Sequence, residues 1–195
     1  YSCRIFATIV NLGLVKIPAN GTITTGEINI GSTTAANTAN HNRTLLSNGP
    51  ELRQTFTGKP DSIRFWAKFS APDINQNARM HAVIHTNHDY TDPQNDNSLS
   101  DYVVAKAEKN FPQGDQQWHE YTVPFIYNDD VSRIPAYLLL TFTTNKEPGK
   151  GSDKDYVWID DIDFIYTKRF SNLEVLADGN TVPFNEFNPN RNEYD

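Results

Sequence analysis

The sequence contains a single cysteine, and it has no apolar run long enough to span a bilayer. One cysteine excludes an intramolecular disulfide and a structural zinc site built on cysteine. The best candidate for a membrane segment, from Ile5 to Val15, is shorter than the ~20 residues that a spanning helix needs and is broken by Asn11 and Gly13. The N-terminus does not have the pattern of a signal peptide either, so it gives no indication of export.

Cys3 allows two interpretations. It could be the lipidated cysteine of a mature lipoprotein, or it could be a small buried thiol. Ile5, Ala7 and Ile9 follow it in a strand-like alternation instead of a flexible polar tether. We therefore favour the buried thiol.

The charge balance is acidic, with 17 basic and 24 acidic side chains and a formal net charge of −7. An acidic surface repels the phosphate backbone, so nucleic acid is an unfavourable partner. Apolar residues make up 37% of the chain and aromatic residues 12%, which favours a folded, β-rich protein over a disordered one.

No segment carries a sustained helical period. Apolar and polar residues alternate instead, in short runs separated by Gly, Pro, Asn and Asp, which is the pattern of β-strands and turns. Many short strands with such turns indicate an all-β sandwich. The predicted strands are Arg4–Val10, Thr22–Ile30, Leu52–Phe56, Ser62–Phe69, Arg79–His85, Tyr102–Ala107, His119–Phe125, Ala136–Thr143 and Tyr156–Tyr166.

Two segments, Gly31–Gly49 and Thr86–Ser100, are polar and read as long loops. The pattern also changes near the C-terminus, so we predict one domain over residues 1–168 and a separate tail over residues 169–195. The tail contains a hairpin pattern around Asp178-Gly179, a favoured two-residue turn. This hairpin either begins a second β module or packs on the sandwich.

Three stretches carry a family resemblance: Phe56–Phe69, Trp118–Tyr127 and Tyr156–Tyr166. In their order and spacing they resemble the carbohydrate-metabolism domain family of surface and secreted proteins in gut-type Gram-negative bacteria. The resemblance implies a galactose-binding-like jelly roll, sugar recognition or processing, and an exported protein at the cell surface or outside the cell. It defines no catalytic residue. The tail from Ser171 resembles the start of a cadherin-like β module.

The predicted strand Ser62–Phe69 supports sugar binding from its residues alone. Its alternation places four apolar side chains on one face and Arg64, Trp66 and Lys68 on the other. Sugars stack on aromatic rings while charged and amide groups bond their hydroxyls, so these three residues are candidate ligand contacts. The alternative is that Trp66 packs against a second sheet and the two cations are only solvated.

Further aromatic and histidine side chains extend this candidate site. Tyr102, Trp118 and Tyr127 could contribute exposed rings. His81 and His85 share one face of the next predicted strand, but four residues at ~3.3 Å each separate them by ~13 Å, too far for one zinc ion. We therefore interpret them as ligand-contacting residues.

Asp160 and Asp161 interrupt the alternation of the last predicted strand, which indicates a β-bulge. In carbohydrate-binding jelly rolls an aspartate of the last strand often helps to hold a structural calcium ion, so the resemblance makes these two residues candidate Ca²⁺ ligands. Calcium needs six to eight oxygen ligands, so other groups would have to contribute. The alternative is that the two aspartates accept hydrogen bonds at a sheet edge.

These features together favour a non-catalytic carbohydrate-binding module of an exported bacterial protein, with an oligo- or polysaccharide as its partner. One alternative is a structural or adhesion module of a cell-surface protein, next to another β module. A second is a glycan-active hydrolase, which needs two carboxylates across a cleft. The sequence supplies acidic residues but no pairing between them, and no nucleophile motif, so we assign no catalytic residue.

Overall fold

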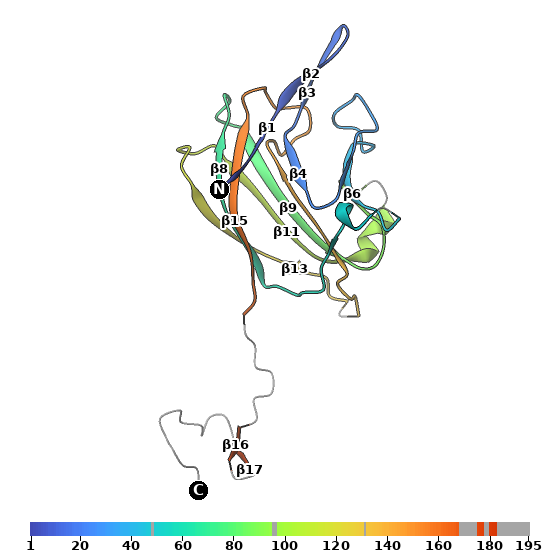
Figure 1. Ribbon diagram of the computed structural model, residues 1–195, viewed down its shortest axis with the longest axis vertical. Helices are drawn as coiled ribbons and strands as arrows, with labels where there is room; N and C mark the ends of the chain where they lie inside the picture. Colours follow the sequence, from blue (N-terminus) through green and yellow to red (C-terminus); the bar gives the residue numbers. More distant parts are fainter. Residues whose placement is uncertain (48, 95–96, 131, 168–174, 178–179, 183–195) are drawn as a thin grey trace.

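Two antiparallel β-sheets packed face to face form the body of the protein in the computed structural model (Figure 1). The structure describes residues 1–47, 49–94, 97–130, 132–167, 175–177 and 180–182. The first sheet has the strand order β1 (Cys3–Phe6), β15 (Tyr156–Ile165), β8 (Ser62–Ser70) and β12 (His119–Pro124). The second has the order β13 (Ile126–Tyr127), β11 (Val103–Pro112), β9 (Asn77–His85), β14 (Tyr137–Thr143) and β4 (Thr22–Thr24), and β7 (Gln54–Thr55) also pairs with β14. The predicted all-β sandwich is therefore confirmed.

The core lies between these two sheets and follows from the alternation of their strands. In β8 the odd-numbered positions from Ile63 to Phe69 are buried, and β9 contributes Met80 and its even-numbered neighbours. The ring of Phe65 lies 5.1 Å from that of Phe142 and 5.4 Å from that of Tyr121, measured between centroids. Each fully buried side chain of this kind contributes roughly 1.5–3 kcal/mol of burial free energy.

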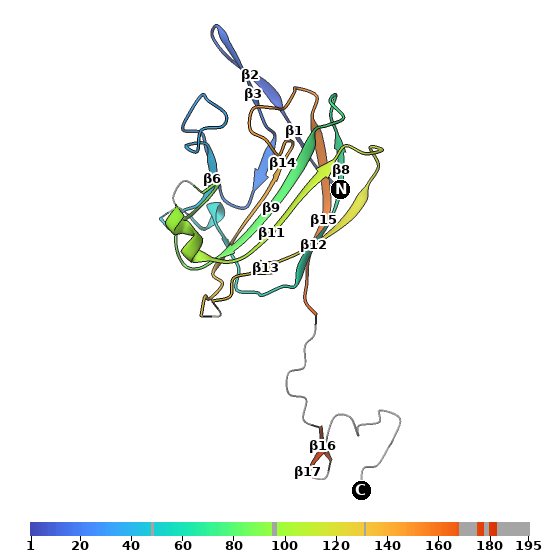
Figure 2. The same ribbon diagram turned by 180° about the vertical axis from the view of Figure 1, so that it is seen from behind.

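A third, smaller sheet covers part of the outer face of the second sheet. Its order is β10 (Tyr90–Asp92), β6 (His41–Thr44) and β5 (Glu27–Asn29). A second apolar cluster fills the space beneath it: Val83, Tyr90, Leu99, Val103 and Leu139. In Figure 2 the 3-10 helix η2 (Asn97–Tyr102), coloured yellow-green, lies on the same side of the second sheet as β6.

This third sheet corrects the sequence prediction at three places. The predicted strand Thr22–Ile30 is divided into β4, in the second sheet, and β5, in the third. The predicted loops Gly31–Gly49 and Thr86–Ser100 contain β6 and β10, which pair with each other. Both strands are short and largely polar, so they lack the apolar alternation by which strands are recognised in a sequence. A second 3-10 helix, η1 (Pro50–Leu52), follows β6.

The N-terminal region differs from the prediction. The predicted strand Arg4–Val10 is divided between β1 and the first strand of a hairpin, and the second strand of that hairpin was not predicted. β2 (Thr8–Leu12) pairs with β3 (Val15–Ala19), and Gly13 takes a positive φ of 69° in the turn between them. Cys3, on the preceding edge strand β1, is exposed, so the prediction of a buried thiol is wrong. The edge position explains this exposure, because a neighbouring strand covers β1 on one side only.

The predicted bulge in the last strand is confirmed. The register between β15 and β8 shifts between Asp160 and Asp163, and Asp161 has a positive φ of 48°. From the bulge onward, the regular alternation of buried residues in β15 ends.

The end of the predicted domain, at residue 168, lies outside the described residues. Beyond it, β16 (Val175–Ala177) pairs with β17 (Asn180–Val182), as the hairpin pattern predicts, although its turn at Asp178-Gly179 is not among the described residues. Whether this pair begins a second module stays a prediction. None of the helices in the described part of the chain has the length and apolar character needed to cross a membrane.

Candidate functional site

All three tryptophans of the chain lie on the solvent-facing side of the first sheet. Trp66 is in β8, Trp158 is in β15, and Trp118 directly precedes β12. Trp66 and Trp118 are 36% and 37% exposed, which is unusual for the largest apolar side chain. We call this surface the tryptophan face, and it consists of Phe6, Arg64, Trp66, Lys68, Trp118, Glu120, Tyr156, Trp158 and Asp160.

Strand pairing explains how these residues come together. Trp66 lies opposite Glu120 of β12 on one side and opposite Asp160 of β15 on the other. Lys68, one outward position along β8, lies opposite Trp158. Because the residues between them point into the core, each strand presents its aromatic and charged side chains on one outer surface.

Local contacts hold several of these side chains in place. The Lys68 ammonium lies 4.5 Å from the centre of the Trp158 ring, and the Tyr156 and Trp158 ring centroids are 5.9 Å apart. At the other end of the face Arg64 donates to Asp163 at 2.7 Å. This hydrogen bond raises the pKa of Arg64, so the guanidinium stays charged. The pair is largely exposed and its contribution to stability is small.

Half-exposed indole rings between charged side chains suit a ligand with alternating apolar and polar surfaces. An indole ring offers a flat apolar surface, and the neighbouring lysine, glutamate and aspartate offer donors and acceptors. A pyranose ring has this character, with C–H faces and a rim of hydroxyls.

A separate cleft of about 540 Å³ lies on the outer face of the second sheet. The β2–β3 hairpin and β5 form its sides, and outward-facing residues of β9 and β14 form its floor. Aliphatic side chains line the two sides: Val10, Ile17 and Pro18 on the hairpin, and Ile28 and Ile30 on and after β5.

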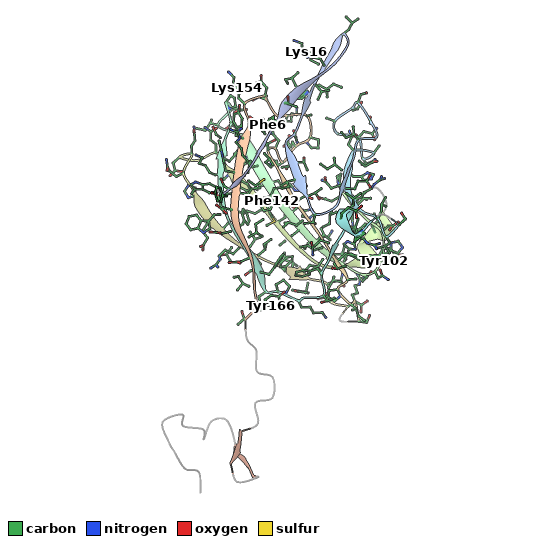
Figure 3. The ribbon with its side chains drawn as sticks, viewed as in Figure 1. Phe6, Lys16, Tyr102, Phe142, Lys154 and Tyr166 are labelled. Atoms are coloured by element: carbon green, nitrogen blue, oxygen red, sulfur yellow. The ribbon has the colours of Figure 1, made fainter. Side chains whose placement is uncertain are left out.

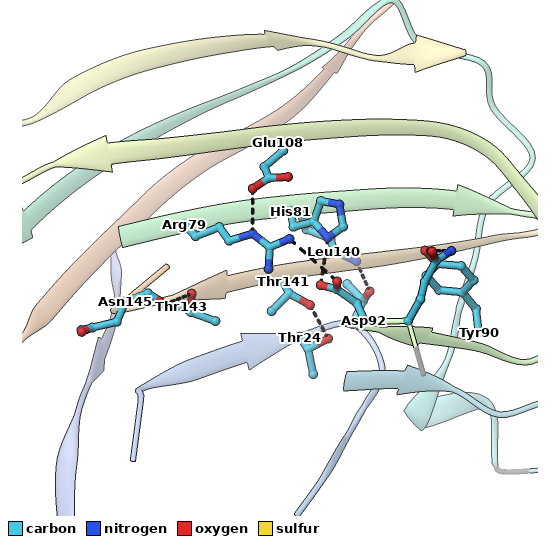
Figure 4. Close-up of polar contacts among 12 residues, drawn as sticks. Thr24, Arg79, His81, Tyr90, Asp92, Glu108, Leu140, Thr141, Thr143 and Asn145 are labelled. Carbon is cyan, nitrogen blue, oxygen red and sulfur yellow. Dashed lines mark hydrogen bonds and ion pairs between the residues drawn. The ribbon is translucent and has the colours of Figure 1, made fainter. Parts of the chain in front are cut away.

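Charged groups at the floor of the cleft are bound to one another (Figure 4). Asp92 accepts a hydrogen bond from His81 at 2.8 Å, and Arg79 lies 3.8 Å from Asp92 and donates to Glu108 at 3.0 Å. Burial opposes ionisation of Asp92, but the hydrogen bond from His81 and the nearby charges of His81, Arg79 and Lys106 outweigh it and lower the pKa of this carboxyl. The floor therefore carries charges that largely neutralise each other.

Four of the predicted ligand residues, Arg64, Trp66, Lys68 and Trp118, belong to the tryptophan face. The others are elsewhere. His81 binds Asp92 beside the cleft floor, and Tyr102 stacks on His88 with 3.6 Å between ring centroids. Tyr127 is half-buried and donates to the carbonyl of Pro60, and burial raises its pKa to about 12.

His85 lies in the interior, although its sequence position suggested a ligand contact. Its ring is fully buried between those of Tyr90 and Tyr137, with centroids 5.1 Å and 5.7 Å away. Nδ1 donates to the carbonyl of Thr86, and Nε2 accepts from the hydroxyl of Thr44. Burial is the main cause that lowers the pKa of His85 to about 4, so the ring is neutral and has a structural role.

The predicted calcium ligands do not form a complete site. Asp160 accepts the backbone N–H of Asp161, and Asp163, the nearest further acid along the strand, is bound to Arg64. No group of three or more His, Cys, Asp or Glu side chains among the described residues is arranged to hold a metal ion. Two carboxylates are far fewer than the six to eight oxygens that calcium takes, so we derive no function from calcium, and Asp160 and Asp161 stay predicted ligands only.

Trp158 and Tyr156 belong to the tryptophan face but were not among the predicted ligand residues. Both alternate with the buried residues Val157 and Ile159, so the period of two already assigned them to the outer side. The cleft had no comparable signal, because its sides come from the hairpin and from β5, which meet only in the folded chain.

No protein-family model matches the chain, and no relative is found among the curated proteins. Two crystal structures are similar in fold. A protein from Bacteroides thetaiotaomicron VPI-5482, provisionally assigned as a glycoside hydrolase, matches with a TM-score of 0.56 and 14% identity over 78% of this chain. A second provisional glycoside hydrolase, from Bacteroides vulgatus ATCC 8482, matches with a TM-score of 0.53 and 16% identity over 76% of this chain.

The chain spans 48% of the first of these proteins and 65% of the second. At such low identity the likeness shows a shared β-rich fold.

Proposed function

We propose that this chain is a non-catalytic carbohydrate-binding module of an exported bacterial protein, with a jelly-roll fold of the galactose-binding-like kind. Its binding surface is the tryptophan face, and its ligand is an oligo- or polysaccharide. One observation carries the proposal: all three tryptophans share one solvent-facing sheet surface, interleaved with charged side chains. The fold likeness to proteins provisionally assigned as glycoside hydrolases supports the substrate class.

Exposed indole rings cost free energy because water must be ordered around their apolar surface, and a ligand that covers them removes this cost. Each ring that a sugar covers loses contact with water over its flat apolar surface. The carboxylates of Glu120 and Asp160 on either side of Trp66 can accept hydrogen bonds from sugar hydroxyls, and Lys68 can donate. Because the face is a sheet surface, it can contact several sugar units along a chain.

Hydrolysis is less well supported than binding. A glycosidase needs a general acid whose pKa is raised so that it stays protonated. The pKa values of Asp92, Asp115 and Asp130 are lowered, which is the opposite of what a general acid requires. Asp92 is also buried and bound to His81, which leaves it poorly placed to protonate a leaving group.

The proposal is tested by measuring binding to cellulose, xylan, mannan, starch and mucin glycans with calorimetry and pull-down. We expect Trp66→Ala and Trp118→Ala each to weaken binding about tenfold or more, equivalent to about 1.4 kcal/mol. Tyr166→Ala is the matched control, since it removes an aromatic ring that is 53% exposed and outside the tryptophan face (Figure 3). Equal binding by the two tryptophan variants and the control would refute the assignment, as would no binding by the wild type at millimolar sugar.

A further inference from the structure

The β2–β3 hairpin projects from the sandwich (Figures 1 and 3). In the described part of the chain its two strands pair only with each other, so it is a sheet of two strands with both long edges open. Leu14, in the turn, is completely exposed, and Val10 is 40% exposed. An isolated two-stranded hairpin is marginally stable in water, and additional strands stabilise it.

The hollow beside the hairpin is equally apolar. Ile28 and Ile30, across the cleft from the hairpin, are 49% and 83% exposed. Single exposed aliphatic side chains are normal on a protein surface. Here, however, the projecting hairpin with Leu14 at its tip and the adjacent cleft of about 540 Å³ lie at the same end of the molecule.

The chemistry of the cleft determines what can occupy it. Apart from His41, no aromatic ring is among the described residues that line it, so it offers a sugar no indole or phenyl ring to stack on. Arg79, at the floor, is paired with Asp92 and with Glu108, and Lys146, which also lines the cleft, lies 3.9 Å from Glu147. Both of these cations therefore already have a carboxylate partner. Aliphatic sides together with open strand edges suit an extended strand with aliphatic side chains.

We propose that the occupant is the hairpin of a second copy of this chain. In a two-fold dimer each hairpin would add its strands to the open edge of its counterpart, and each Leu14 would cover the aliphatic side chains of the other cleft. A two-fold interface uses the same surface on both partners. This chain meets that requirement, because each copy carries both the projecting hairpin and the cleft. A strand from another protein could fill the cleft but would leave Leu14 at the hairpin tip exposed.

Charge favours contact at this end of the molecule. Residues 8–19 include one charged side chain, Lys16, whereas the whole chain carries a formal charge of −7. Two copies that meet through the hairpin therefore avoid the mutual repulsion of their acidic surfaces. The inference does not depend on the proposed sugar binding, because the tryptophan face is on the other sheet.

The test is sedimentation equilibrium of the full chain from about 1 μM to about 500 μM, a range that covers typical weak self-association. All variants carry Cys3→Ser, because the exposed thiol could otherwise form a disulfide-linked dimer. We expect the average mass to rise from 22.1 kDa towards twice that value as concentration increases. Leu14→Asp and Ile30→Asp should each weaken association at least tenfold.

Ile134→Asp is the matched control, since Ile134 is 75% exposed and outside the cleft and hairpin. Because all three positions are exposed, these variants should fold, and circular dichroism checks this. The proposal is overturned if the Cys3→Ser chain keeps the monomer mass over the whole range, or if Leu14→Asp and Ile134→Asp, both in the Cys3→Ser background, associate equally. Glycan binding measured on the same variants reports separately on the proposed function.

Discussion

The ammonium group of Lys68 lies 4.5 Å from the centre of the Trp158 ring, on the side of the first sheet that faces solvent. The two residues belong to neighbouring strands and are direct partners in the β8–β15 register. A cation over an indole face holds the ring and the lysine side chain in a fixed relative position. At an exposed site, such a cation–π interaction contributes about 0.5–1 kcal/mol. This contact joins a polar donor to a stacking surface.

Replacing this lysine should therefore affect ligand binding more than stability. We expect Lys68→Met to weaken polysaccharide binding about three- to tenfold, because the sugar loses a donor and Trp158 loses a positioning contact. The free energy of unfolding should change by no more than about 1 kcal/mol. Calorimetry and urea unfolding measure the two effects, and unchanged binding would show that Lys68 has no part in recognition.

The core between the sheets yields a second prediction. Phe65 is fully buried and contacts aromatic rings from β11, β12 and β14. Phe65→Ala should lower the free energy of unfolding by about 3–5 kcal/mol, through lost burial and a cavity. Ile126→Ala, at a position that is 77% exposed, should change it by less than about 0.5 kcal/mol. Urea unfolding compares them, and a loss below about 1 kcal/mol for Phe65→Ala would contradict the assigned core.

The sequence predicted the core strands well and the site only in part. Ile63 and Phe65 alternate with Arg64 and Trp66 in β8, and such a period of two fixes which side chains enter the core. His85 follows the same pattern but is buried, because the third sheet covers that part of the outer face. Nothing in the local sequence around His85 indicates that the third sheet covers it, because β6 and β10 are short and polar and lie far apart in the chain.

The buried network at the cleft floor gives a prediction with an internal control. The Asp92 side chain is 8% exposed and binds His81 and Arg79. Asp92→Asn removes the negative charge, leaves the Arg79 guanidinium less well compensated and weakens the hydrogen bond with His81, so we expect a loss of about 2–4 kcal/mol in the free energy of unfolding. Asp163→Asn breaks the exposed pair with Arg64, so it should change the free energy of unfolding much less than Asp92→Asn does. Thermal and urea unfolding of both variants test the difference, and equal losses would refute the buried role of Asp92.

The buried His85 should make stability depend on pH in a defined direction. Burial is the main cause of its folded pKa of about 4, whereas an unfolded histidine titrates near 6.5. A depressed histidine pKa means that the unfolded chain binds the extra proton first as pH falls. The contribution of the neutral His85 ring to the free energy of unfolding is therefore fully present above about pH 6.5. It is lost progressively between about pH 6.5 and pH 4, by roughly 3 kcal/mol in total.

The variant His85→Phe isolates this contribution. It keeps an aromatic ring between Tyr90 and Tyr137, but this ring has no nitrogen atoms. It therefore cannot take up a proton, and it lacks the hydrogen bonds to Thr44 and Thr86 at every pH. We expect it to be less stable than the wild-type chain at pH 7 and to close much of that gap at pH 4.5. Urea unfolding at pH 7, 5.5 and 4.5 measures the difference between the two proteins, which cancels the carboxylates that titrate in both. A difference that stays constant over this range would mean that His85 is already charged in the folded state or is not buried as described.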